Sequence, residues 1–122
     1  MAPIPMLHIS TRRVYEPASP RDGLRILVDR LWPRGMSKEA AALDLWAQDV
    51  APSEALRKWF DHRPERFAEF KRRYTDELQS NRALCELKDY VGRSKATLLF
   101  GAKDLEFNQA VVLAEVLSAQ VG

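Results

Sequence analysis

The sequence predicts an α/β domain with a small central sheet of three to four strands, mixed or parallel, flanked by helices. Two short apolar runs, residues 26–28 and 96–100, lie between turn residues and are typical of buried strands. Between them, apolar residues recur at helical spacing over residues 53–91. Strands near both ends of the chain, with helices between and after them, favour a layered α/β architecture.

The first two strands are expected at residues 8–14 and 24–28, since the first alternates loosely and the second holds a continuous apolar run. The turn residues Pro17, Pro20 and Gly23 mark the intervening segment as a loop. This loop is shorter than a normal helical crossover. It is either a hairpin loop, or it contains one helical turn and leaves the two strands parallel.

An irregular segment follows over residues 29–35, because Pro33 and Gly35 interrupt any regular element. Ser37 is placed to cap a short helical turn that runs through residue 41. Residues 43–47 are predicted as a third strand. Ser53 then has the position of an N-cap for a helix over the next residues.

Two helices are expected between residues 64 and 92. Pro64 suits the first helical position, and Phe67, Phe70, Tyr74 and Leu78 form a stripe at helical spacing. The stripe changes phase after residues 80–81, which indicates a break and a second helix that ends at Gly92. A central strand over 96–100, a loop over 101–105 and a buried helix over 106–120 complete the domain. Phe70 and Leu98 are predicted core residues.

Length and composition set the class of protein. The 122 residues are expected to form one domain over 1–122, in which 1–7 are expected to be a flexible N-terminal segment. A net charge of +2 does not by itself indicate nucleic acid or a membrane as partner. One cysteine and two histidines cannot form a disulfide or a usual zinc site, so no metal or cofactor is expected. Without a signal or membrane-span pattern, a cytoplasmic protein is expected. Cys85 is predicted to be a buried structural thiol.

Polar residues follow two of the predicted strands directly, and they are the candidate site. Ligands of open α/β sheets bind beyond the carboxyl ends of the strands. If the two strands are parallel neighbours, their loops form one crevice, and a helix beginning near residue 106 directs its amides there. The predicted ligand is a small anion, phosphate- or carboxylate-bearing, held by Arg30 and Arg34, because arginine suits bidentate recognition of such groups. The other candidates are Lys103, Asn108 and Trp32 for ligand binding, and Asp29 and Asp104 as weak general-base candidates.

Simpler roles compete for several of these residues. Asp104 is equally suited to capping the last helix, and Trp32 to packing. His62 is expected on the surface, and it becomes a proton donor only if its turn folds over the crevice. Whether the chain is an enzyme and whether it forms oligomers stay open.

Two other classes of function compete with the small-ligand reading. The first is a nucleic-acid-associated module that uses the basic residues Arg12, Arg13, Arg21, Arg25, Lys71, Arg72 and Arg73. The second is a protein-interaction adaptor with an exposed apolar patch that includes Trp46 or Trp59. A solvated helix face is the simplest reading of residues 71–73.

Three sequence blocks resemble the YeaO-like branch of domain-of-unknown-function family 488. The first is Val-Asp-Arg-Leu-Trp-Pro-Arg-Gly at residues 28–35, and the others cover 51–60 and 98–108. The resemblance implies a small cytoplasmic α/β protein of bacteria or archaea, without an established reaction. Two positions depart from the family pattern: Phe107 stands where a histidine often precedes the asparagine, and Arg63 where an aspartate often caps the helix.

Overall fold

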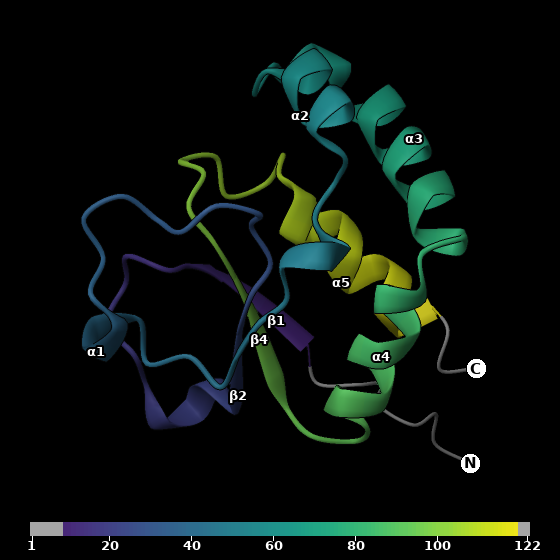
Figure 1. Cartoon of the computed structure of the whole chain (residues 1–122). Coiled ribbons are helices and arrows are strands. Elements are labelled where there is room, and N and C mark those ends of the chain that lie inside the picture. Colours follow the sequence, from purple (N-terminus) through teal and green to yellow (C-terminus); the bar gives the residue numbers. More distant parts are fainter. Residues whose placement is uncertain (1–8, 120–122) are drawn as a thin grey trace.

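Four parallel strands form a single sheet in the computed structural model, which describes residues 9–119 (Figure 1). The strand order is β1-β4-β2-β3, with β1 at Ile9–Arg13, β2 at Leu24–Leu27, β3 at Leu45–Trp46 and β4 at Ala96–Phe100. The expected α/β class and strand number are confirmed, and the sheet is parallel throughout. The predicted flexible segment 1–7 and His8 lie outside the described residues.

The short connection between β1 and β2 contains one helical turn and leaves the strands parallel. That turn is the 3-10 segment Pro20–Asp22, which Ser19 and Asp22 hold by a capping box. The two strands do not pair with each other, because β4 lies between them and pairs with both. Gly23, at φ +66°, lets the chain pass Lys95, whose carbonyl oxygen would lie 2.3 Å from an added Cβ.

The helices are α1 at Lys38–Ala41, α2 at Glu54–Phe60, α3 at Phe67–Gln79, α4 at Arg82–Val91 and α5 at Gln109–Ala119. The caps that the sequence predicts are present: the Ser37 and Ser53 side chains accept from backbone amides of α1 and α2. Pro64 begins the 3-10 turn before α3, and the break after residue 79 separates α3 from α4, which Gly92 ends. The local signals therefore place these boundaries within a few residues.

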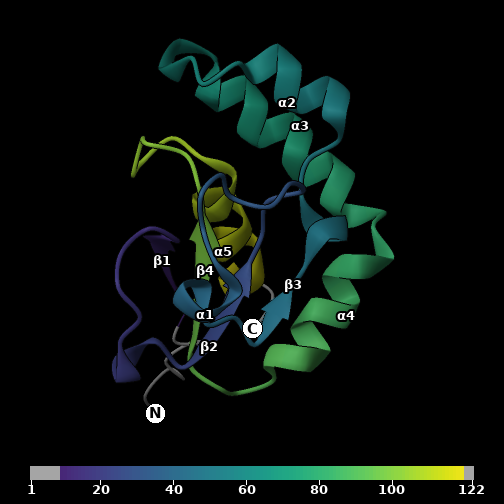
Figure 2. The same ribbon diagram turned by 60° about the vertical axis from the view of Figure 1, so that its left-hand side comes forward.

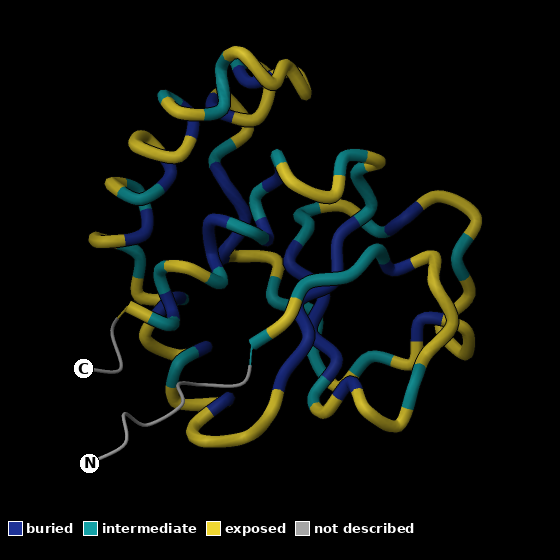
Figure 3. The backbone as a smooth tube through the Cα atoms, turned by 180° about the vertical axis from the view of Figure 1, so that it is seen from behind, coloured by how far each residue is buried: buried dark blue, intermediate teal, exposed yellow. Residues whose placement is uncertain are grey.

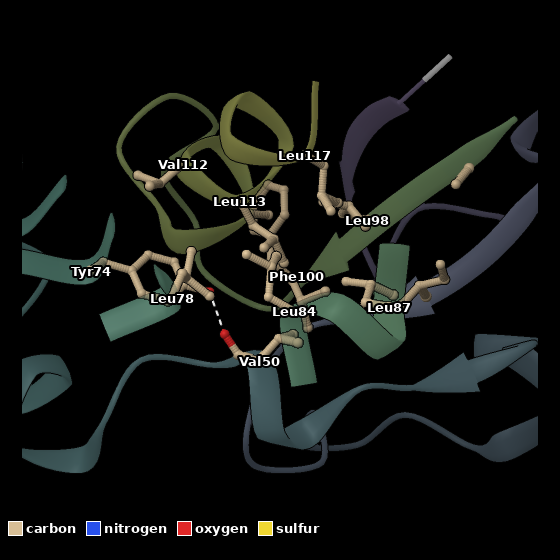
Figure 4. Packing of buried hydrophobic residues seen from close by; sticks show 14 of the residues in the cluster. Val50, Tyr74, Leu78, Leu84, Leu87, Leu98, Phe100, Val112, Leu113 and Leu117 are labelled. Atoms are coloured by element: carbon tan, nitrogen blue, oxygen red, sulfur yellow. Dashed lines mark hydrogen bonds between the residues drawn. The ribbon is translucent and has the colours of Figure 1, made fainter. Parts of the chain in front are cut away.

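The larger core lies between one face of the sheet and the helices α3, α4 and α5. Leu98 and Phe100 from β4 pack with Tyr74, Leu87 and Leu113 from the three helices (Figure 4). The Tyr74 hydroxyl donates to the Val50 carbonyl, so the polar atom of this buried ring is satisfied (Figure 4). Phe70 and Leu98, the predicted core residues, are both buried.

The opposite face of the sheet is covered by loops and the short helix α1 instead of long helices. A second cluster there contains Val14, Leu27, Ala41 and Leu99, with the ring of Trp32 packed against it. Both faces are therefore covered, which explains why all five residues of β4 are buried. Figure 3 shows the same pattern, with buried backbone at the sheet and exposed residues on the outer helices and loops.

Cys85 is exposed, so the prediction of a buried thiol is wrong. Leu84, Leu87 and Val91 are the buried residues of α4. Since each residue turns about 100° around a helix axis, the residue directly after Leu84 points away from the core. Helical phase, and not proximity to leucines in the sequence, therefore decides which side chains of α4 are buried.

The α2–α3 hairpin extends past the carboxyl ends of the strands (Figure 2). Near the end of α2, the loops that follow β2 and β4 run along the same edge of the sheet (Figures 1 and 2). Within residues 9–119, no helix has the length and apolar character needed to cross a bilayer.

Candidate functional site

A cavity of about 290 Å³ lies at the carboxyl edge of the sheet, where the sequence places the candidate site. Its wall comes from the loops after β1, β2 and β4, from α2 and α3, and from the first residue of α5. We call it the edge pocket. The residues that line it are Tyr15, Asp29, Arg30, Leu31, Trp32, Pro33, Arg34, Ala51, Pro52, Arg57, Phe60, His62, Phe70, Gly101, Ala102 and Gln109.

Asp29 connects the two strand ends that form the pocket. Since β2 and β4 pair in parallel, Asp29 and Gly101 meet at the sheet edge, and the Gly101 amide donates to Asp29 Oδ2 at 2.8 Å. The Gln109 side chain donates to the other carboxylate oxygen. Burial raises the pKa of Asp29 to about 6, although the Gly101 amide, the Gln109 amide and the charge of His62 act in the opposite direction.

Arg30 is half-buried beneath the α2 end of the pocket. Its Nη2 donates to the carbonyl oxygen of Ala51 at 3.2 Å and lies 3.5 Å from that of Pro52. Its Nε is buried and has no hydrogen-bond partner among the described residues. A buried N–H without a partner costs free energy, so Arg30 keeps an unsatisfied donor next to the pocket that it lines.

The rest of the loop after β2 is fixed by its own contacts. The Trp32 indole donates to the Met36 carbonyl at 2.7 Å and packs edge-on against Trp46, with ring centroids 5.2 Å apart. Trp32 thus has the packing role and also lines the pocket. The Tyr15 hydroxyl donates to the Arg34 carbonyl at 2.9 Å. This hydrogen bond uses the main chain of Arg34, so its exposed guanidinium group takes no part in it.

The candidates from the loop after β4 do not line the pocket. Lys103 is exposed outside it, and the side chain of Asp104 accepts from the Glu106 and Phe107 amides. These two backbone hydrogen bonds lower the pKa of Asp104, so it is poorly suited to act as a base.

Asn108 is 1% exposed, and it rather than Asp104 caps α5, by accepting from the Val111 amide. The helix begins at Gln109 instead of near residue 106. Side chains occupy three amides of this segment: Asp104 accepts from residues 106 and 107, which precede the helix, and Asn108 accepts from residue 111 in its first turn.

The sequence alone does not predict three side chains of the pocket: Arg57 and Gln109 are not among its candidates, and His62 is expected on the surface. Arg57 and Gln109 have no local signal, because only the packing of α2 and α5 against the sheet edge brings them there. His62 does reach the pocket: Asp61 and His62 are left-handed, with φ of +49° and +54°, and this turn folds over the crevice. The charge of His62 contributes to lowering the pKa of both Asp29 and Asp104.

The basic residues outside the pocket are mostly engaged by acids or carbonyls. Arg12 and Arg25 pair with Asp22, Arg13 donates to the carbonyls of residues 101 and 102, and Arg21 is exposed. On α3, Lys71 pairs with Glu115, and Arg72 and Arg73 pair with Glu69.

The two tryptophans of the adaptor hypothesis are both partly covered. Trp46 donates to the Asp29 carbonyl, and the guanidinium groups of Arg66 and Arg73 lie over the ring of Trp59. Across the described part of the chain, no three His, Cys, Asp or Glu residues lie close enough to hold a metal ion.

These features define a small parallel α/β domain with an arginine-lined pocket at the carboxyl edge of its sheet. The chain belongs to the YeaO-like part of the DUF488 family, and a family model described as "Inactive DUF488-N3 subclade" matches residues 8–122. It is 44% identical over 112 residues to the uncharacterised protein Rv3073c of Mycobacterium tuberculosis (strain H37Rv), covering 92% of this chain and 95% of the relative. It is also 44% identical to the uncharacterised protein YeaO of Escherichia coli (strain K12), covering 91% of this chain and 97% of the relative. No solved structure matches.

Proposed function

We propose that this protein binds a small phosphate- or carboxylate-bearing ligand in the edge pocket, with Arg30 and Arg34 holding the anion. One observation carries the proposal: Arg30, Arg34 and Arg57 line the pocket, and none of them forms an ion pair with any described residue. Arginine guanidinium groups match the geometry of carboxylate and phosphate oxygens. Three such groups without an acidic partner create a positive site that favours an anion.

The charge balance of the pocket supports this proposal. Asp29 is the one carboxylate among the lining residues, and the three arginines outnumber it. The guanidinium group of Arg30 also keeps a donor, Nε, that no described residue satisfies. Lys103, exposed on the neighbouring loop, adds positive charge at longer range. Asn108 contributes indirectly, because it caps α5 and so holds Gln109 at the pocket.

Binding without turnover agrees best with the groups at hand. Backbone amides engage Asp104 and lower its pKa, and both oxygens of the Asp29 carboxylate accept a hydrogen bond, from Gly101 and Gln109. Phe107 stands where family members often have a histidine. The description of the matching subclade as inactive is consistent with a domain that binds a ligand and does not transform it.

A nucleic-acid-associated module and an adaptor have less support. A nucleic-acid surface requires cations that are free to contact phosphates. Arg12, Arg25, Arg72 and Arg73 are instead paired with acids. An adaptor requires an exposed apolar patch, whereas Trp46 and Trp59 are half-buried.

Thermal unfolding in phosphate tests the proposal. A ligand that binds only the folded state stabilises it by about 2.7 kcal/mol at one hundred times its Kd. Phosphate at millimolar concentration should therefore raise the Tm of the wild type above that in chloride at equal ionic strength. The same comparison with acetate in place of phosphate tests whether the site binds a carboxylate. Arg30→Ala and Arg34→Ala should each remove most of the increment.

Arg93→Ala is the matched control, because Arg93 is an exposed arginine that lies before the amino end of β4, whereas the pocket lies at the carboxyl ends of the strands, and it does not line the pocket. It should keep the full increment. An increment retained in both pocket variants would refute the proposal. If Arg30→Ala unfolds without ligand, Arg34→Ala alone decides, since Arg34 is exposed and its side chain has no hydrogen bond within the described residues.

A further inference from the structure

We infer that the ligand of the edge pocket is an aryl anion, that is, a single flat apolar ring carrying the phosphate or carboxylate group. This inference rests on the proposed function and specifies the body of the ligand in addition to its charged head. It depends on three features of the pocket: its apolar wall, the small number of polar side chains other than arginines that lack a partner, and its size.

Aromatic and aliphatic side chains form most of the wall away from the arginines. The ring of Phe60 stacks on Phe70 with centroids 4.3 Å apart and an interplanar angle of 21°, and both rings line the pocket. Trp32 lines it from the loop after β2. Aromatic rings favour offset or edge contacts with other flat rings, and a guanidinium group also stacks on them. The wall therefore fits an aromatic body.

Two exposed apolar side chains stand at the same pocket. Within residues 9–119, four large hydrophobic side chains are exposed, namely Tyr15, Leu31, Tyr90 and Leu105. Tyr15 and Leu31 both line the edge pocket, and Leu31 is 67% exposed. Exposed apolar surface beside a concave site marks contact with an apolar group. A ligand that consisted of the anion alone would leave this surface in water.

Most polar side chains of the pocket other than the arginines already have partners, and His62 is the one that forms no hydrogen bond with a described residue. Asp29 accepts from Gly101 and Gln109, and the Tyr15 hydroxyl donates to the Arg34 carbonyl. A polyhydroxylated body such as a sugar would find few free partners and would bury hydroxyl groups at a cost. An apolar ring gives up no hydrogen bonds with water when it enters such a site, and its charged group still contacts the arginines.

The volume limits the ligand to one small ring system. The cavity holds about 290 Å³, at the lower end of the range of about 300–1,000 Å³ typical of ligand sites. A single ring with its head group fits this space, whereas a larger cofactor would extend into solvent.

Titration calorimetry with phenyl phosphate and methyl phosphate tests the inference, because the two esters have the same head group and differ in the apolar body. Phenyl phosphate should bind the wild type at least about tenfold more tightly, since burial of five additional ring carbons is favourable. Benzoate against acetate repeats the comparison for a carboxylate head and decides which of the two head groups the site prefers.

The Leu31→Ala variant tests whether the ring of phenyl phosphate binds in the edge pocket. It should reduce the preference for phenyl over methyl phosphate by about fourfold, the effect of roughly one buried methylene group. Leu105→Ala is the matched control: Leu105 is 59% exposed and does not line the pocket, so the preference should be unchanged. Both variants remove a leucine from an exposed loop site, so neither is expected to unfold the protein.

The outcomes separate this inference from the proposed function. Equal affinity for the two esters, with binding abolished in Arg34→Ala, would overturn the aryl inference and leave anion binding intact. Absence of binding for inorganic phosphate and for all four organic probes would overturn both. A preference that Leu31→Ala and Leu105→Ala reduce equally would also overturn the inference, because the ring would not be bound at the edge pocket.

Discussion

Two groups of arginines in this molecule have opposite surroundings. On one face of the sheet, Arg25 donates to Asp22 at 2.5 Å and to the Ala41 carbonyl, and Arg12 donates to the other oxygen of Asp22 at 2.8 Å. At the edge pocket, Arg30 and Arg34 face a cavity and form no ion pair with a described residue. The first group connects β1, β2 and α1, whereas the second is available to a ligand.

The two groups of arginines differ in whether a carboxylate lies within reach of the guanidinium groups. Asp22 is 3% exposed, and its position in the 3-10 turn before β2 directs its carboxylate toward both arginines. Burial by itself raises the pKa of Asp22, but the Ser19 amide and the two guanidinium groups outweigh it and lower the pKa. In the pocket, the one lining acid, Asp29, accepts from Gly101 and Gln109 instead of from an arginine.

The largest expected effect comes from removing the acid of the paired group. Asp22→Ala leaves Arg25, which is 5% exposed, as a buried charge without its carboxylate. Breaking a buried pair in this way typically destabilises a protein by about 3–5 kcal/mol. Urea unfolding should show this loss as a lower midpoint. Asp76→Ala, which removes an exposed partner of Arg72, is the control and should leave the midpoint unchanged.

A smaller effect, with a distinctive pH dependence, is expected at Asp29. Because its pKa is about 6 in the folded state and near 3.8 ordinarily, the folded state binds the proton more tightly than the unfolded state does. Its contribution to stability is therefore greatest below pH 4 and falls as the pH rises through 6. The free energy of unfolding of Asp29→Asn, relative to that of wild type, should therefore rise by up to about 3 kcal/mol between pH 4 and pH 7.

Urea unfolding of both proteins at several pH values measures this change. Asp22 supplies the contrast, since its lowered pKa means that its contribution is lost as the pH falls through the folded-state pKa. A stability difference between Asp29→Asn and wild type that does not vary with pH would show that Asp29 has an ordinary pKa.

The smallest effect is expected at the pocket arginine. Arg34→Ala removes an exposed side chain without an ion pair among the described residues, so unfolding without ligand should change by less than about 0.5 kcal/mol. Chemical denaturation in chloride measures this directly. A large loss would place Arg34 with Arg25 as a structural residue, and the contrast between the two groups would disappear.

The sequence by itself determined the local elements and the edge of the sheet where the candidate site lies. Capping residues such as Ser37 and Ser53, and the apolar stripe from Phe67 to Leu78, act within one or two helical turns, so their effects are visible in the pattern. The apolar runs of β2 and β4 also predicted buried strands, whose polar ends proved to be neighbours.

Only the tertiary structure decided which side chains share the pocket. The insertion of β4 between β1 and β2 joins segments about 70 to 90 residues apart, and the pattern left open whether those first two strands were parallel. Arg57, His62 and Gln109 reach the pocket through the packing of α2 and α5, while Asn108 is drawn into a cap and Cys85 turns outward. Such placements depend on the balance of many long-range contacts, whereas a local pattern records only the burial and capping preferences of neighbouring residues.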